Sequence, residues 1–156
     1  MGRSVAIKPE PPERLLEQYL RQQIPLSAAM GVQVNTATLQ RVELSAPLAP
    51  NVNHSETLFG GSAAALATLA AWALLHLRME QAGLSARLVI QRSRMQYETP
   101  IPGDFQALCR FCDELAWERF RNTLARRGRA RLTLAAQLLY QARRMATFEG
   151  DFVALA

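Results

Sequence analysis

The chain has 156 residues, of which 49% are hydrophobic and 20% charged, and its formal net charge is +5 at pH 7. These fractions are ordinary for a soluble globular protein, so we expect a single domain over residues 1–156 and exclude repeat and low-complexity architectures. Lys8 is the only lysine, so the positive charge comes almost wholly from arginine. A basic chain favours an acidic partner, namely nucleic acid, the phosphates of coenzyme A or an acidic carrier protein, unless the charge is only a solvated surface.

The N-terminal part is predicted to be a tail followed by one amphipathic helix and a hairpin. Residues 1–9 contain no apolar signal core, so we expect a disordered tail, no secretion signal and a cytoplasmic protein. Over residues 10–23, Leu16, Tyr19 and Leu20 recur at helical spacing, and Pro25 ends the helix. Residues 31–38 and 39–48 alternate in polarity as the two strands of a hairpin do.

An uncharged segment from Thr57 to Leu77 organises the rest of the chain. It contains no Asp, Glu, Lys or Arg, and its alanines and leucines occupy every face of a helix that is predicted to stop near Gly83. Such a helix is long enough to span a membrane. We prefer a helix buried inside a soluble sheet and expect no membrane span, because the segment is rich in alanine and carries Thr68 and His76.

The second half of the chain alternates between strand and turn patterns. Residues 88–97 are predicted as a strand with Val89, Met95 and Tyr97 on one face and Leu88 on the other. Residues 104–112, 129–140 and 145–155 are further strands, and residues 113–127 form a helix that ends before Gly128. A single antiparallel sheet wrapped around the long central helix satisfies this order of elements. The predicted fold class is therefore α+β, of the hotdog type.

The cysteines, Cys109 and Cys112, have the spacing of a redox or metal-binding pair. Their odd offset on a strand points the two side chains to opposite faces, and both histidines lie far away in the sequence. We therefore interpret them as structural thiols in a reducing compartment and expect no metal site.

One set of residues carries a resemblance to a known family. The set comprises Asn51-Val52-Asn53, Thr57-Leu58-Phe59-Gly60-Gly61-Ser62, Trp72, and the turn residues Tyr97, Pro100, Gly103 and Asp104. This pattern resembles the hotdog-fold acyl-thioester enzymes, in particular the thioesterase branch similar to the C-terminal domain of YiiD. Some members of that branch are malonyl-acyl carrier protein decarboxylases that supply acetyl primers for fatty-acid synthesis.

The resemblance implies roles for particular residues. Related phenylacetyl-thioesterases have an Asn six residues before a His-Gly-Gly sequence and an acid nine residues after that His. Asn53 fits the first position, whereas Phe59 stands where the His would be and Thr68 where the acid would be. Because that acid is the usual nucleophile or general base, its replacement by Thr68 argues against hydrolysis by that route. Asn53 and Thr68 are thus the implied catalytic residues, without a cofactor.

The start of the long helix suggests what the remaining groups do. Free N–H groups at Gly60, Gly61 and Ser62, next to Phe59, together with the Asn53 amide, could stabilise the oxyanion of hydrolysis or the enolate formed when a malonyl thioester loses carbon dioxide. We favour decarboxylation, with thioester hydrolysis and a non-catalytic acyl-binding module as alternatives. Structural readings also stay open for these residues. The glycines could serve merely to form a tight turn or to let the helix pack, and Asn53 could serve merely to hold its own loop in place.

Structural readings also compete for two further side chains. Thr68 could bond a helical carbonyl. Glu56 is the only loop acid near enough in sequence to serve as a base, and an exposed, solvated Glu is the simpler account of it.

The arginines provide candidate carrier contacts. Arg92 and Arg94 share one strand face, and Arg126, Arg127, Arg129 and Arg131 lie around a loop, so they could bind the phosphate of a phosphopantetheine arm or an acidic carrier protein. Nucleic-acid binding is disfavoured because interleaved aromatic residues are lacking. The resemblance further implies a homodimer, or a dimer of dimers, that pairs through the third strands, with Asn53 and Thr68 of one site supplied by different protomers.

Overall fold

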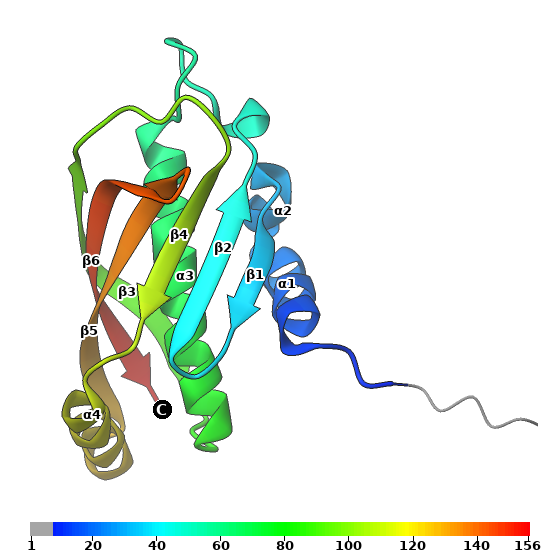
Figure 1. Cartoon of the computed structure of the whole chain (residues 1–156). Helices are drawn as coiled ribbons and strands as arrows, with labels where there is room; N and C mark the ends of the chain where they lie inside the picture. Colours follow the sequence, from blue (N-terminus) through cyan, green and yellow to red (C-terminus); the bar gives the residue numbers. More distant parts are fainter. Residues whose placement is uncertain (1–7) are drawn as a thin grey trace, which may run out of the picture.

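The centre of the protein is one long helix, α3 (Gly60–Gln81), which lies against a curved sheet of six strands (Figure 1). The computed structural model describes residues 8–156. Most of the expected tail of residues 1–9 therefore lies outside the described residues. The expected α+β architecture, an antiparallel sheet around a central helix, is confirmed.

The strand order places two strands at free edges of the sheet. The strands are β1 (Gln33–Ala37), β2 (Arg41–Ala46), β3 (Arg87–Tyr97), β4 (Phe105–Arg110), β5 (Arg129–Tyr140) and β6 (Arg143–Leu155). They pair antiparallel in the order β1-β2-β4-β5-β6-β3. Within the described residues, β3 therefore has β6 on one side and an open edge on the other.

Helix α3 is buried because it is apolar on every face. Leu66, Leu74 and Leu75 are fully buried, and the small alanines between them let the helix lie close to β2, β4 and β5. By length and composition alone this helix could also cross a membrane, and half of its most apolar window is buried inside the protein. The segment is thus a core helix of the sheet in this structure.

The shorter helices cover the ends and one side of the sheet. They are α1 (Pro12–Gln23), α2 (Pro25–Met30), the single 3₁₀ turn η1 (Ala49–Asn51) and α4 (Glu114–Arg127). The prediction missed α2, because Pro25 ends α1 and also starts the next helix, where its fixed φ and missing N–H are tolerated. Gly31 then ends α2 at a φ of 74°, which explains why β1 begins later than expected.

A bulge in β3 changes which side chains face the core. The register of β3 against β6 shifts between Ile90 and Arg92, so the alternation reverses at that point. Leu88 and Met95 consequently both pack against the core, whereas Val89 is exposed. The predicted grouping of Val89 with Met95 on one face was therefore wrong. A strict two-residue period cannot anticipate one extra residue.

A buried arginine connects the far end of α3 to α4. Arg78 is 7% exposed, its Nη1 donates to the Leu39 carbonyl at 2.7 Å, and its Nη2 lies 2.7 Å from a Glu114 carboxylate oxygen. The guanidinium carbon lies 3.8 Å from the ring centre of Phe111 and 4.8 Å from that of Trp117. The cation is therefore held by one carbonyl, one carboxylate and two aromatic faces.

Replacing Arg78 with alanine is expected to lower the free energy of unfolding by about 2–3 kcal/mol, because the Leu39 carbonyl loses its partner and the aromatic rings lose the cation. Urea denaturation followed by circular dichroism measures this change. Glu114→Gln is the matched control and is expected to cost no more than ~1 kcal/mol, because the Glu114 side chain is 65% exposed. Equal losses in the two variants would contradict this account of the buried cation.

Candidate active site

A hollow of about 370 Å³ lies beside the first turn of α3. Its walls come from the loop before α3, from the turn after β3 and from the start of β6. The residues are Asn53, Thr57, Leu58, Gly60, Ala63, Tyr97, Glu98, Thr99, Pro100, Ile101 and Ala146. Most of these side chains are apolar or small, and the polar groups sit at the helix start and on the turn after β3. An acyl group with one polar end fits such a surface.

The helix start presents N–H groups without helical acceptors. The first helical bond in α3 is from the Ala63 N–H to the Phe59 carbonyl, at 3.1 Å, and no side chain of Phe59 caps the helix. The N–H groups of Gly60, Gly61 and Ser62 therefore precede the hydrogen-bonded part of the helix, at the positive end of its dipole. Of these residues, Gly60 lines the hollow. This end of the helix can stabilise negative charge on a bound oxygen.

Close packing explains one of the two glycines at the helix start. A Cβ atom on Gly61 would overlap the ring of Phe59, which lies across the first turn and is itself 56% exposed. At Gly60, a Cβ would come 3.4 Å from the hydroxyl of Tyr97, which donates a hydrogen bond to the Gly60 carbonyl at 3.0 Å. Close packing therefore accounts for the glycine at position 61, whereas a Cβ at Gly60 would make only an ordinary contact, and neither observation conflicts with a binding role.

Asn53 holds its own loop together. Its Oδ1 accepts hydrogen bonds from the N–H groups of Ser55 (2.8 Å) and Thr57 (3.1 Å). Its Nδ2 donates to Thr57 Oγ1 at 2.9 Å and to the Leu58 carbonyl at 3.3 Å. Both N–H bonds of the amide are therefore used within the loop. In a single chain, Asn53 lines the hollow and acts as a positioning residue for the loop that enters α3.

Two further motif residues, Asn51 and Asp104, also hold segments of the backbone in place through hydrogen bonds. The buried Asn51 donates to the carbonyls of Met30 (2.9 Å) and Pro47 (2.8 Å), and its own carbonyl accepts from the Phe59 N–H at 2.8 Å. Asp104 accepts from the Leu48 N–H at 2.9 Å. These bonds connect distant segments to the residue just before α3, which fixes the position of the helix start.

Thr68 lies two turns further along α3 and does not line the hollow. Its hydroxyl donates to the Ala64 carbonyl at 2.8 Å, as a helical threonine commonly does. The structure therefore does not bring Thr68 and Asn53 together within one chain. That two protomers bring them together stays a prediction.

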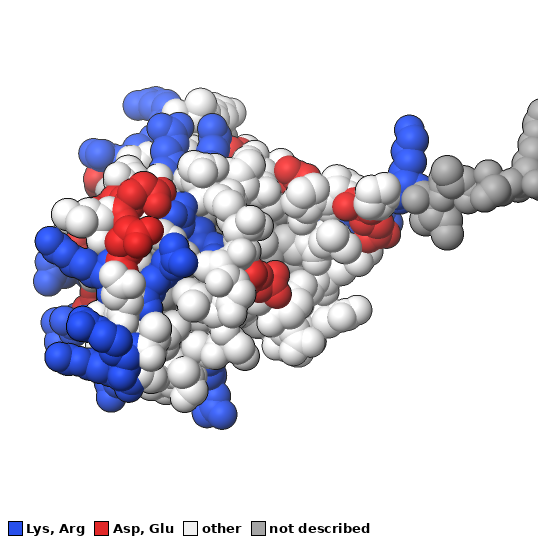
Figure 2. All heavy atoms as spheres, turned by 90° about the horizontal axis from the view of Figure 1, so that it is seen from below, with Lys and Arg blue, Asp and Glu red and all other residues white. Residues whose placement is uncertain are grey.

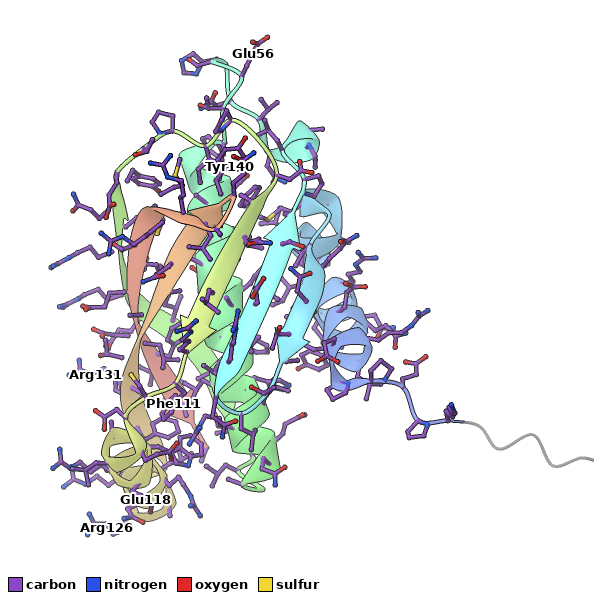
Figure 3. The ribbon with its side chains drawn as sticks, in the orientation of Figure 1. Glu56, Phe111, Glu118, Arg126, Arg131 and Tyr140 are labelled. Carbon is purple, nitrogen blue, oxygen red and sulfur yellow. The ribbon has the colours of Figure 1, made fainter. Side chains whose placement is uncertain are left out.

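Sequence reasoning missed an acid in the hollow, Glu98. It directly follows Tyr97 at the end of β3, its side chain is 34% exposed, and one carboxylate oxygen lies 3.4 Å from Arg144 Nη2. Its place next to a motif tyrosine was the signal that could have revealed it. Glu56, the acid considered earlier, sits at the exposed tip of its loop with a φ of 63° and points away from the hollow (Figure 3).

The arginines proposed for carrier binding lie elsewhere. Arg92 and Arg94 are exposed on β3, and Arg127 and Arg129 lie where α4 turns into β5. None of them lines the hollow at the helix start.

The cysteines occupy different environments. Cys109 is buried in β4 with its Sγ 3.2 Å from the Ala135 carbonyl oxygen, whereas Cys112 lies beyond the strand end and is exposed. Burial, together with the neighbouring Cys112, raises the pKa of the Cys109 thiol to about 12. Both thiols are free in the structure, and Cys112 lies outside the strand in which we expected it from the sequence.

Comparison with known proteins identifies the family to which this architecture corresponds. A family model described as "Putative thioesterase (yiiD_Cterm)" matches residues 13–156. The match covers every helix and strand from the first turn of α1 onward, and it includes the complete hollow.

Several solved structures share the fold over almost their entire length. A protein of unknown function from Chlorobaculum tepidum is 28% identical, with a TM-score of 0.87 over 92% of this chain and 93% of that one. A Shewanella oneidensis protein described as a "putative thioesterase" is 26% identical, with a TM-score of 0.81 over 92% and 97%. A Pseudomonas aeruginosa protein described as a "Probable Thioesterase" is 21% identical, with a TM-score of 0.80 over 93% and 96%, and shows the fold alone.

At about pH 8, a thiol reagent such as DTNB is expected to modify Cys112 and leave Cys109 unmodified in the folded protein. Because its pKa is raised to about 12, Cys109 stays protonated, and the protonated thiol is not nucleophilic. The absorbance of the released thiolate counts the reacting cysteines, and both are expected to react in guanidinium. A folded Cys112→Ser variant that still reacts rapidly would contradict this assignment.

Proposed function

The chain belongs to this thioesterase family, and we propose that it is an enzyme of acyl thioesters that decarboxylates a malonyl group held on acyl carrier protein. The observation that carries the proposal is the start of α3, where N–H groups without helical acceptors adjoin an apolar hollow. That arrangement binds a thioester carbonyl oxygen and stabilises the negative charge it acquires.

The reaction needs little beyond charge stabilisation. The bond between the malonyl methylene carbon and its carboxylate breaks, carbon dioxide leaves, and the electron pair moves onto the thioester carbonyl oxygen as an enolate. The N–H groups at Gly60, Gly61 and Ser62 stabilise this enolate, and one preorganised donor contributes roughly 3 kcal/mol to a transition state. A proton from solvent then adds to the methylene carbon and yields an acetyl thioester.

The residue at position 68 favours this reaction over hydrolysis. An acid there would repel the malonyl carboxylate by about 4 kcal/mol at a separation of ~4 Å and an effective dielectric constant near 20. Thr68 carries no charge, and its hydroxyl is bonded to the Ala64 carbonyl. The substrate carboxylate can therefore approach without a like charge from α3.

A homodimer is part of the same proposal. Strand β3 leaves an open edge along its length, and Val89 and Tyr97 on this strand are 40% and 55% exposed. A long unpaired edge with apolar side chains favours pairing with a second strand. Pairing of two β3 edges would extend the sheet across two protomers and place the half-buried Thr68 face of α3 near the partner subunit.

Incubation of the protein with malonyl-acyl carrier protein is expected to release carbon dioxide and form acetyl-acyl carrier protein, which mass spectrometry of the carrier detects. Thr68→Asp is expected to lower kcat/KM about 100-fold by charge repulsion, and the uncharged control Thr68→Val by less than about 3-fold. Hydrolysis of acyl thioesters without any acetyl product would contradict the proposal.

Hydrolysis is the second candidate function, and Glu98 favours it. A general base must lie within reach of the water that attacks the thioester carbon, and Glu98 is the acid on the wall of the hollow. Its ion pair with Arg144 is partly exposed, which leaves its second carboxylate oxygen able to accept a proton from water. In this reading the helix start stabilises a tetrahedral oxyanion in place of an enolate.

Glu98→Gln separates the two reactions. If hydrolysis uses this base, the variant is expected to hydrolyse acyl-CoA about 100-fold more slowly, because an amide cannot take the proton from water. Decarboxylation is expected not to fall, since that reaction needs no base and the variant removes a negative charge from the hollow that holds the malonyl carboxylate. Spectrophotometric detection of released CoA thiol measures the first rate, and Glu56→Gln is the matched control with its acid at the exposed loop tip. Equal hydrolysis by Glu98→Gln and the wild type would exclude Glu98 as the base.

A further inference from the structure

Basic side chains gather at the end of the molecule that carries α4. Viewed from below, the Lys and Arg side chains on the visible face gather at one side of the molecule, away from the N-terminal end, with a few acidic groups between them (Figure 2). The sequence alone does not distinguish which of these arginines are balanced by neighbouring acids. The strand register does.

The register separates the arginines into two groups. Arg92 and Arg94 of β3 lie opposite Asp151 and Glu149 of β6, so each has an acid as its cross-strand neighbour. The second group has no such neighbours. Arg129 lies opposite Leu155, and Arg131 lies opposite Val153.

The second group surrounds a shallow hollow of about 440 Å³ on the surface. Arg127, Arg129 and Arg131 line it, and the polar side chains of Thr123 and Gln91 complete the rim. Within residues 8–156, no acid lies within salt-bridge distance of these three arginines or of Arg92 and Arg94, so the two groups differ in their cross-strand neighbours and in the hollow that only the second group lines. Figure 3 shows Arg131 pointing outward from β5, away from α3.

Interaction with the negative end of the α4 helix dipole does not account for all three arginines. Arg127 lies in the last turn of α4, where a cation offsets the negative end of the helix dipole. Arg129 and Arg131 lie beyond Gly128, on the strand, and have no such role. Several guanidinium groups that lie close together repel one another. A bound oxyanion relieves this repulsion and accepts bidentate hydrogen bonds from the planar guanidinium groups.

We propose that this hollow binds a phosphate group of the thioester's carrier, through Arg127, Arg129 and Arg131. The inference rests on the proposed function for the identity of the ligand. The chemistry is shared by coenzyme A and by the phosphopantetheine arm of a carrier protein, because both join the thiol-bearing arm to a phosphate. The proposed site places carrier binding at the α4–β5 junction, and Arg92 and Arg94 take no part in it.

The hollow at the start of α3 and the arginine hollow lie far apart within one chain. We therefore assign the two hollows of one complete site to different protomers. Ala146 lines the hollow at the helix start and Val153 lines the arginine hollow, and both lie on β6. Seven strand residues span about 23 Å. If two β3 edges pair antiparallel over their full length, the first residue, Arg87, lies opposite the last, Tyr97 of the partner subunit.

The pairing continues inward from that edge. Arg87 pairs with Leu155, and Leu155 pairs with Arg129. The arginine hollow of one protomer, on the outer face of the sheet, is then three strand spacings, roughly 14 Å, from Tyr97 of the partner subunit. This is shorter than the distance to its own helix start, so the hollow is assigned to the partner's site.

Binding of free coenzyme A, measured by isothermal titration calorimetry, tests the phosphate site without requiring turnover. The double variant Arg129→Gln/Arg131→Gln is expected to bind coenzyme A at least about 10-fold more weakly than the wild type, with a smaller dependence on salt. Arg92→Gln/Arg94→Gln removes the same charge and is the matched control, expected to bind within about 2-fold of the wild type. All four residues are exposed, so thermal unfolding is expected to be unchanged.

Further ligands identify the source of the phosphate. Weaker binding of dephospho-coenzyme A assigns the hollow to the 3′-phosphate, and equal binding assigns it to the diphosphate. Preference for holo- over apo-acyl carrier protein, lost in Arg129→Gln/Arg131→Gln, assigns it to the carrier-bound arm. Equal weakening in both double variants, or no binding of any of these ligands by the wild type, would overturn the proposal. Arginine-dependent binding without turnover of any thioester would instead overturn the proposed function alone.

Mixed dimers test the arrangement across protomers. Asn53→Ala and Arg129→Gln/Arg131→Gln are each expected to be weakly active alone. When they are combined as mixed dimers, one of the two sites regains both an intact loop and intact arginines, and activity is expected to rise several-fold. No gain on mixing would show that both elements must come from one chain and would overturn the cross-protomer arrangement.

Discussion

The structure depends on one constraint, which is that α3 has no face suited to water. Its side chains from Gly60 to Leu77 are uncharged, and the fully buried leucines and alanines occur all around the helix. A flat sheet would cover only one side of such a helix. A strongly curved antiparallel sheet covers more, and α1 adds cover through Tyr19, which stacks on Trp72 and His76 with ring centres 6.2 and 4.8 Å apart. The curvature of the sheet is thus a consequence of burying this one helix.

This constraint also determines where a ligand can reach the helix. Strands β2, β4 and β5 pack against α3, and its interior N–H groups are bonded within the helix, so free N–H groups are available to a ligand only at its start. Asn51 and Asn53 hold the loop that enters the helix, and the Tyr97 hydroxyl bonds the Gly60 carbonyl from the end of β3. The apolar hollow at this end follows from the same packing. Fold and site therefore have a common physical origin.

Charge is divided between the two ends of the molecule. The hollow at the helix start is mostly apolar and contains one acid, Glu98, paired with Arg144. The opposite end holds Arg127, Arg129 and Arg131 around a second, polar hollow. The phosphate of a thioester's carrier suits the arginine end, whereas the thioester group itself suits the hollow at the helix start. One chain holds the two ends apart, and an antiparallel dimer is the arrangement that would bring them together.

The sequence by itself predicted the strands, the helices other than α2, and the fold class, and it suggested a site at the start of α3, because these inferences rest on local patterns: the uncharged run before Gly83, the alternation of the strands and the glycines at the helix start. It could not determine the bulge in β3, since one inserted residue leaves no mark on an alternating pattern. Only the tertiary structure brought Glu98 into the hollow, showed that the Asn53 amide is used within its loop, and separated the arginines with acidic neighbours from those without. The bonds of Asn53 depend on the exact conformation of its loop, whereas the neighbours of the arginines depend on which strands pair and in what register, and pairing between distant segments is a property of the folded chain alone.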